Sequence, residues 1–126
     1  MTDMFVSKQF TFAAAHSLYG HKKCGGVHGH TYTLEITLKG EIPNKSAYVD
    51  KWMVHDFEKI NSTVNIIIKK YDHTNLNDFM EYPTSEVILM RLFDDFVDLD
   101  EGFADMIYEM KLWESPTSYA KFYPNL

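Results

Sequence analysis

The chain has 126 residues, 45% of them hydrophobic and 15% aromatic, which supports one packed domain over residues 1–126 and excludes disorder. Twelve basic against eighteen acidic side chains give a net charge of −6, and this excludes a nucleic-acid partner held by phosphate contacts. No apolar run approaches the roughly 20 residues of a membrane helix, and the N-terminus has no signal-peptide pattern. Together with the single cysteine, which suits a reducing compartment, this predicts a cytoplasmic protein with no membrane partner.

Two segments near the N-terminus alternate between apolar and polar residues, which is the pattern of half-buried strands. The first predicts a strand whose inward face is formed by Val6, Phe10, Phe12, Ala14 and His16. The second runs from His28 to Lys39, and its inward face is formed by His28, His30, Tyr32, Leu34, Ile36 and Leu38. A turn at Pro43-Asn44 then leads into a short extended piece from Tyr48 to Val54.

Two amphipathic helices are predicted next. Asp56 has the side chain of a helix N-cap, and the apolar stripe that follows at helical spacing is Phe57, Ile60, Val64, Ile67, Ile68 and Tyr71. After a polar loop over 72–82, Thr84 is the predicted cap of a second helix, whose buried stripe is Ile88, Leu92, Phe96 and Leu99. Gly102 is expected to end this helical region.

The C-terminal part predicts two more strands. The first has one face formed by Met106, Tyr108, Met110 and Leu112, and the second covers 118–123. The order strand-strand-helix-helix-strand-strand predicts an α+β domain, with an antiparallel four-stranded sheet and both helices on one face. Such a sheet has two open edges and an uncovered face with large apolar residues. We therefore expect a homo-oligomer in which sheets join edge to edge.

Three of the six histidines lie on the inward face of the two N-terminal strands. His28 and His30 are about 7 Å apart along one strand, and His16 ends the neighbouring strand. Imidazoles that converge from adjacent strands suit zinc, and three of them leave one coordination position open, as in catalytic sites. The alternative is that one or two of them are ordinary histidines with hydrogen-bond partners.

Cys24 lies four residues before His28, next to Gly25 and Gly26. Three interpretations are open: Cys24 is a fourth zinc ligand, a catalytic thiol beside the metal, or an inert buried cysteine. The two glycines favour an exposed loop, which weakens the third interpretation. A nearby cation and histidines would favour the thiolate that acid–base or nucleophilic chemistry requires.

Two further polar features are candidates for the site. Asp72 directly precedes His73, and a carboxylate can orient a neighbouring imidazole, although such pairs also occur in solvated loops. Glu114 continues the inward face of its strand, where a carboxylate needs a partner, and a ligand with adjacent N–H donors would supply one. Glu109 and Lys111 have the opposite parity and are expected to face solvent.

Six short motifs together resemble the 6-pyruvoyltetrahydropterin synthase family, in particular its bacterial 6-carboxytetrahydropterin synthases of queuosine and 7-deazaguanine biosynthesis. In chain order they are Phe10-Thr11-Phe12-Ala13-Ala14-Ala15-His16, Cys24-x3-His28-Gly29-His30, Val54-His55-Asp56-Phe57, Asp72-His73-x2-Leu76-Asn77, Pro83-Thr84-Ser85-Glu86 and Trp113-Glu114-Ser115. Each motif is weak alone, but six in this order are specific. The resemblance implies the tunnel-fold (T-fold), whose subunits form trimeric barrels that stack, often as hexamers.

The resemblance also implies a role for each candidate residue. The ligands of a catalytic Zn²⁺ would be His16, His28 and His30, and the residues that carry proton transfers would be Cys24, Asp72 and His73. Glu114 would anchor the pterin ring during catalysis. The residues beside that pocket would be Thr84, Ser85 and Glu86. The three-residue gap between Cys24 and His28 resembles that of the carboxytetrahydropterin branch.

The implied reaction is a carbon–carbon lyase step that converts 7,8-dihydroneopterin triphosphate to 6-carboxytetrahydropterin, with release of acetaldehyde and triphosphate. A 6-pyruvoyltetrahydropterin synthase is the alternative enzyme. The alternative of another class is a non-catalytic, zinc-stabilised pterin-binding protein with Cys24 as the fourth ligand. Candidate contacts of the triphosphate are Lys8, Lys22 and Lys23, although a neighbouring subunit could equally supply them.

Overall fold

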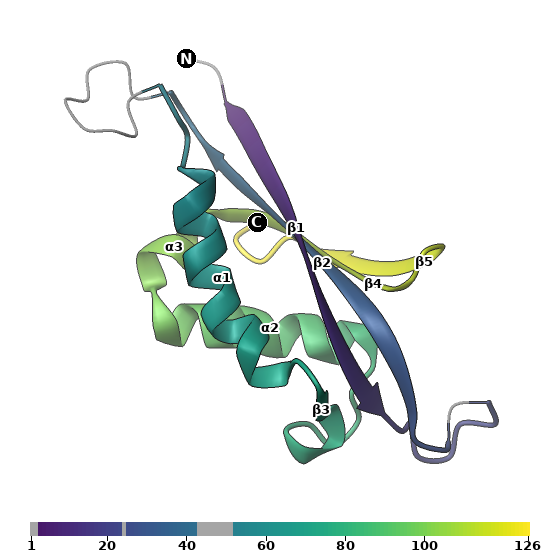
Figure 1. Ribbon diagram of the computed structural model, residues 1–126. Helices are drawn as coiled ribbons and strands as arrows, with labels where there is room; N and C mark the ends of the chain where they lie inside the picture. Colours follow the sequence, from purple (N-terminus) through teal and green to yellow (C-terminus); the bar gives the residue numbers. More distant parts are fainter. Residues whose placement is uncertain (1–2, 24, 43–51) are drawn as a thin grey trace.

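The computed structural model describes residues 3–23, 25–42 and 52–126 as a sheet with helices on one of its faces (Figure 1). Its elements in chain order are β1 (Met4–His16), β2 (His28–Gly40), α1 (Phe57–Tyr71), β3 (Thr74–Asn75), the 3-10 turn η1 (Leu76–Asp78), α2 (Ser85–Leu99), α3 (Glu101–Met106), β4 (Ile107–Ser115) and β5 (Ser118–Phe122). The turn expected at Pro43-Asn44, most of the extended piece expected over 48–54, and Cys24 lie outside the described residues.

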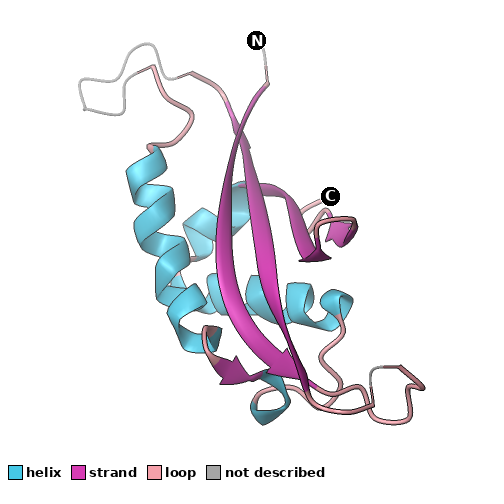
Figure 2. Cartoon of the chain, turned by 45° about the vertical axis from the view of Figure 1, so that its right-hand side comes forward, coloured by secondary structure: helices cyan, strands magenta, loops and turns pink. Residues whose placement is uncertain are grey.

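The sheet has the strand order β3-β1-β2-β4-β5, and its pairs are antiparallel except for the short parallel pair of β1 with β3. β1 and β2 pair along their full length, from Met4 opposite Gly40 to His16 opposite His28, and form the long curved ribbon of Figure 2. The predicted α+β architecture is confirmed, with five strands in place of four. The additional strand, β3, has two residues, too few to produce a recognisable alternation.

Both predicted helix N-caps are confirmed. The Asp56 carboxylate accepts from the Glu58 N–H at the start of α1, and the Thr84 hydroxyl accepts from the Val87 N–H at the start of α2. Each cap satisfies a backbone donor that the helix itself leaves free. Within the described ranges, no helix has the length and apolar character needed to cross a membrane.

Three expectations for the helices are wrong. Phe57 and Leu99 are exposed, because each stands at a helix end, past the residues that pack on the sheet. Gly102 does not end the helical region but lies inside α3. The reason is that the Asp100 side chain accepts from the Phe103 N–H and so caps a new helix directly after α2.

A β-bulge shifts the inward face of β4. Two consecutive residues of β2 stand opposite three residues of β4, at 107–109. Ile107 is buried in place of Tyr108, whose ring instead packs against Phe5 on the other face of the sheet. The predicted inward position of Tyr108 is therefore wrong, whereas Met110 and Leu112, beyond the bulge, are buried as predicted.

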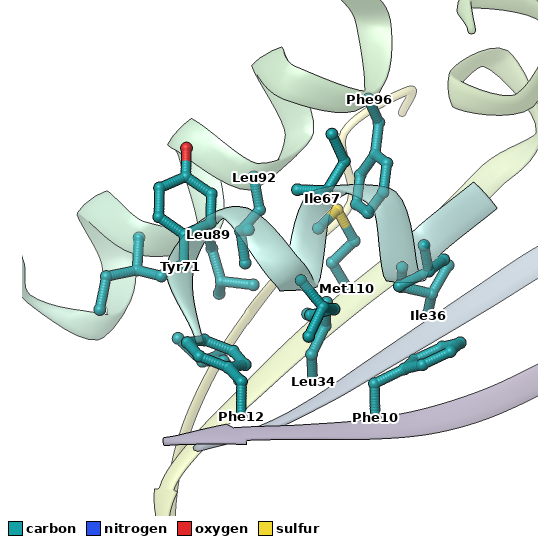
Figure 3. Packing of buried hydrophobic residues seen from close by; sticks show 14 of the residues in the cluster. Phe10, Phe12, Leu34, Ile36, Ile67, Tyr71, Leu89, Leu92, Phe96 and Met110 are labelled. Atoms are coloured by element: carbon teal, nitrogen blue, oxygen red, sulfur yellow. The ribbon is translucent and has the colours of Figure 1, made fainter. Parts of the chain in front are cut away.

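The hydrophobic core fills the space between the sheet and the helices (Figure 3). From the sheet it includes Phe10, Phe12, Leu34, Ile36 and Met110, and from α1 and α2 it includes Ile67, Tyr71, Leu89, Leu92 and Phe96. The sheet residues are those of the predicted inward faces, so the alternation of β1 and β2 is confirmed. The same inward face continues to the ends of these two strands, where the histidines stand.

The sheet face opposite the helices is mixed in character. Polar side chains pair across the strands there, as Gln9 does with Glu35 at 3.1 Å. Aromatic residues gather toward β4 and β5, where the rings of Trp113 and Tyr119 have centroids 5.2 Å apart. The expectation of large apolar residues on the uncovered face is therefore met over only part of it.

Candidate metal centre

Three histidines converge where β1 ends and β2 begins. The strand register places His16 directly opposite His28, and His30 follows two residues along β2 on the same face. Their ring centroids are 4.7 to 5.1 Å apart, and one ring nitrogen of each lies within 4.8 Å of those of the other two. His16 is fully buried and the other two are half-buried. The structure thus brings together the three residues expected to bind zinc.

Backbone carbonyls fix the protonation of two of these rings. His16 Nδ1 lies 2.8 Å from Pro83 O, and His28 Nδ1 lies 2.8 Å from Gly26 O. Since a carbonyl only accepts, each Nδ1 carries the hydrogen, and the neutral ring presents a lone pair at Nε2. The Nε2 atoms of His16 and His30 are buried and have no hydrogen-bond partner among the residues that the structure describes. Buried, unpartnered imidazole nitrogens that face one another are suited to a cation.

The Glu114 carboxylate joins the histidines from β4. Its Oε1 lies 3.3 Å from His16 Nε2 and 3.1 Å from His30 Nε2, yet neither nitrogen forms a hydrogen bond with it. Burial lowers the pKa of His30, and the Glu114 charge offsets part of this shift. Three imidazoles and a carboxylate are ligands that zinc prefers. The residues present therefore fit a divalent metal ion.

A second glutamate of β4, Glu109, lies on the face of the strand opposite to this centre. Glu109 Oε1 lies 3.6 Å from Lys111 Nζ, and Glu109 Oε2 lies 3.7 Å from Lys121 Nζ. Glu109 and Lys111 have the parity predicted for the outer face. Glu109 is therefore a matched control for Glu114, since both are glutamates of one strand that face opposite sides of the sheet.

Two residues that contact His16, Tyr32 and Pro83, were not predicted from the sequence as part of the site. The Tyr32 side chain is fully buried, and its hydroxyl lies 3.3 Å from His16 Nδ1. Burial, and then the Glu114 charge, raise the pKa of Tyr32. Its inward parity two residues after His30 was a usable signal. The Pro83 carbonyl, by contrast, is a backbone group that no residue pattern reports.

Asp72 and His73 form a pair at the end of α1. Asp72 Oδ1 accepts from the Ala13 N–H at 2.9 Å and lies 3.0 Å from His73 Nδ1. The Ala13 hydrogen bond first, and then His73, lower the pKa of Asp72. His73 has φ 61°, an uncommon value for a non-glycine residue, and its side chain is 81% exposed. The carboxylate thus orients an imidazole that is open to solvent.

Two hollows adjoin the histidines. One has a volume of about 540 Å³ and is lined by residues that include Ala13, Ala15, His30, Thr31, His73 and Asn75. The other has about 620 Å³ and is lined by residues that include Gln9, His30, Thr31, Thr33, Trp113 and Glu114. Both volumes fall in the range of small-molecule sites, roughly 300–1,000 Å³. His30 lines both hollows, so both adjoin the histidines at this residue.

The remaining candidates lie farther from the centre or outside the described residues. Thr84 caps α2 and Glu86 is exposed in its first turn; among the described residues, neither these two nor Ser85 lines either hollow. Lys22 and Lys23 are exposed. Cys24 is not among the described residues; Gly26, two residues after it, accepts from His28 through its carbonyl.

The segment that follows α1 is anchored to the helices by Tyr71, the last residue of α1. The Tyr71 hydroxyl donates to the Asp95 carboxylate of α2, which also lies 3.5 Å from Arg91 Nε. Arg91 Nη1 donates to Phe79 O at 3.0 Å, so this cluster also holds the residues after η1. Burial first, and then Asp95, raise the pKa of Tyr71.

We expect Tyr71→Phe to lower the free energy of unfolding by about 1–3 kcal/mol, because it removes a hydrogen bond to a charged acceptor. The raised pKa keeps the folded phenol protonated above about pH 10, where tyrosine ionises in an unfolded chain. The stability advantage of wild type is therefore complete below about pH 10 and shrinks as the pH rises further. Urea denaturation of both proteins at neutral and alkaline pH measures this; equal stability at neutral pH would contradict it.

Comparisons with known proteins point to one family. The family model described as 6-pyruvoyl tetrahydropterin synthase matches residues 5–125. The chain is 40% identical over 96 residues to an Archaeoglobus fulgidus protein provisionally named 6-carboxy-5,6,7,8-tetrahydropterin synthase, covering 76% of this chain and 78% of that protein. It is 31% identical over 138 residues to the Haemophilus influenzae 6-carboxy-5,6,7,8-tetrahydropterin synthase, covering 93% and 96%. The solved Caenorhabditis elegans 6-pyruvoyl tetrahydropterin synthase has the same fold, with a TM-score of 0.83 at 22% identity over 98% and 96% of the two chains.

Proposed function

The chain belongs to the 6-pyruvoyl tetrahydropterin synthase family, and from this premise we propose that it is a zinc-dependent 6-carboxy-5,6,7,8-tetrahydropterin synthase, a carbon–carbon lyase. The names of relatives that span most of the chain support this branch. The observation that carries the proposal is the convergence of three imidazoles and the Glu114 carboxylate beside a hollow of small-molecule size. On this proposal, the product enters queuosine or another 7-deazaguanine pathway.

The residues of the site have distinct roles in the proposed reaction of 7,8-dihydroneopterin triphosphate. When bound, zinc supplies Lewis acidity that lowers the pKa of substrate hydroxyls. Cys24, as a thiolate, removes a proton from the substrate side chain. His73, oriented by Asp72 at 3.0 Å, transfers protons on the other face. Glu114 accepts charge-assisted hydrogen bonds from the 2-amino and N3–H groups of the ring.

Product analysis tests the proposal directly. We expect the purified zinc-loaded protein to convert 7,8-dihydroneopterin triphosphate to acetaldehyde, triphosphate and a 6-carboxy pterin, identified by mass spectrometry. Release of triphosphate with a pyruvoyl product and no acetaldehyde would instead identify a 6-pyruvoyltetrahydropterin synthase. Tight pterin binding without turnover would identify the non-catalytic alternative.

We also propose that the protein is a homohexamer made of two trimers. Along the described part of β1, Ala14 and Ala15 pair with β3, and the backbone of Ala13 bonds to Asp72 and His73. The edge from Met4 to Phe12 is therefore open on that side. β5 forms the other edge of the sheet. Long open edges favour pairing with further strands, and closed rings of identical subunits satisfy both edges at once.

Light scattering at micromolar concentration tests the assembly. We expect a mass near six times the 14.7 kDa of one chain. Each open β1 edge would pair with the β5 edge of a neighbour to close a ring of three, and two such rings would make the hexamer. Lys121→Pro, in β5, should reduce the assembled fraction, since proline removes a backbone donor from that edge. A wild-type protein that stays monomeric would refute the assembly.

A further inference from the structure

The contact between Glu114 and the two buried imidazoles needs a positive charge to be stable. His16 carries its hydrogen on Nδ1, because this atom is 2.8 Å from the Pro83 carbonyl. In the neutral ring, the Nε2 lone pair then faces the Glu114 carboxylate oxygen at 3.3 Å, with no hydrogen bond between them. A lone pair and an anion at this distance repel each other unless a proton or a metal ion lies between them. The atoms do not have the geometry of a hydrogen bond, which favours the metal ion. The same oxygen also faces His30 Nε2, at 3.1 Å.

Two separations, those of Glu114 Oε1 from His16 Nε2 and from His30 Nε2, match the ligand spacing of a tetrahedral metal site. With metal–ligand bonds of about 2.0–2.1 Å at tetrahedral angles, two ligand atoms are roughly 3.3 Å apart. Glu114 Oε1 has this spacing from both His16 Nε2 and His30 Nε2. Glu114 Oε1 thus lies at the distance from these two nitrogens that a further metal ligand would have.

The Glu114 side chain is also partly open to solvent. It is 33% exposed, and Glu114 is one of the residues that line the hollow of about 620 Å³. A pterin ring presents two adjacent N–H donors, and pairing with both requires both oxygens of one carboxylate. Turning both oxygens toward the ring would draw Oε1 away from the two imidazole nitrogens.

We propose that Glu114 is the fourth metal ligand of the free protein and leaves the ion when the pterin ring binds. This inference rests on the proposed function for the identity of the ring, but its first half concerns the metal ion alone. The free site is closed by Glu114, and the position that it vacates becomes available to the substrate hydroxyls. Recognition of the ring and opening of the metal site are thereby the same event.

Metal affinity and the spectrum of a substituted metal test the first half without any turnover. We expect Glu114→Gln to weaken Zn²⁺ binding by at least about 10-fold in competition with a chelator, because a neutral amide is a poor ligand. The visible absorption bands of the Co²⁺-substituted protein should change as well. Glu109→Gln, on the opposite face of β4, should change neither, and Glu114→Asp should lie between Glu114→Gln and wild type.

Neopterin, which has the ring and the hydroxylated side chain but no triphosphate, tests the second half. We expect it to change the Co²⁺ bands of the wild-type protein and to leave those of Glu114→Gln unchanged. Unaltered Zn²⁺ affinity and Co²⁺ bands in a folded Glu114→Gln variant would overturn the inference and leave Glu114 as a ring anchor only. A protein that shows these metal effects but produces no acetaldehyde would overturn the proposed function instead, with Glu114 still a ligand.

Discussion

Replacing His28 with alanine is expected to remove most of the zinc while leaving the fold intact. His28 supplies one of the three imidazoles that converge at the centre, and a site that loses a ligand loses most of its affinity. The fold should survive because His28 is half-buried at the first residue of β2, beyond the fully buried Tyr32 and Leu34. Metal analysis of the purified variant, with circular dichroism for the fold, measures both effects.

A second histidine variant controls for nonspecific metal binding. His55 lies before α1 and is not one of the candidate ligands. The centroid of its ring is 5.9 Å from that of the Phe103 ring. We expect His55→Ala to retain zinc like the wild-type protein. Full zinc occupancy in His28→Ala would refute the assignment of the centre, because the two remaining imidazoles cannot hold the ion as well as three.

The strands and the metal centre could be predicted from the same regularity. Side chains of a strand alternate with a period of two, so the inward face that buries Phe12 and Leu34 also carries the histidines at the strand ends. The antiparallel pairing of β1 with β2 then brings His16 opposite His28. No long-range information beyond the pairing of neighbouring strands was needed.

The predictions were wrong where a local feature of the backbone interrupts the alternation of side chains or the end of a helix. The bulge at 107–109 adds one residue and reverses the parity of β4 before Met110, and nothing in the residue types of this stretch reports it. Glu114 was placed correctly because it lies beyond the bulge, in phase with Leu112. The capped helix after Asp100 shows the same limitation, since one side-chain hydrogen bond decides whether a helix restarts there.

The backbone contacts of the centre form a second class that could not be predicted. The Pro83 carbonyl fixes the hydrogen of His16 at 2.8 Å across a sequence separation of 67 residues. Any residue type provides such a carbonyl, so only the packing of the loop before α2 against the end of β1 determines the contact. The orientation of a ligand therefore depends on the tertiary fold even where its identity is evident from the sequence.

Cys24→Ala is expected to lower turnover by at least about 100-fold, the scale of losing a positioned acid–base group. Zinc and pterin binding should persist, because the three imidazoles and Glu114 remain. Measuring turnover, zinc content and neopterin affinity on one preparation separates these effects. In addition, the wild-type rate should rise with pH as the Cys24 thiol ionises. Cys24→Ser should not restore the rate, since a hydroxyl does not ionise in the working pH range.

The same variant distinguishes the two active roles that the sequence leaves open for the thiol. If Cys24 were a permanent fourth ligand, its removal would release zinc or loosen the fold, and no place would remain for Glu114 in a tetrahedral shell. If Cys24 is the catalytic base, Cys24→Ala and Glu114→Gln differ in kind: the first loses turnover with full zinc affinity, and the second loses zinc and ring affinity. If Cys24→Ala turns over as fast as wild type, the catalytic role is refuted. If Cys24→Ala loses zinc while Glu114→Gln binds zinc as tightly as wild type, the thiol is the fourth ligand.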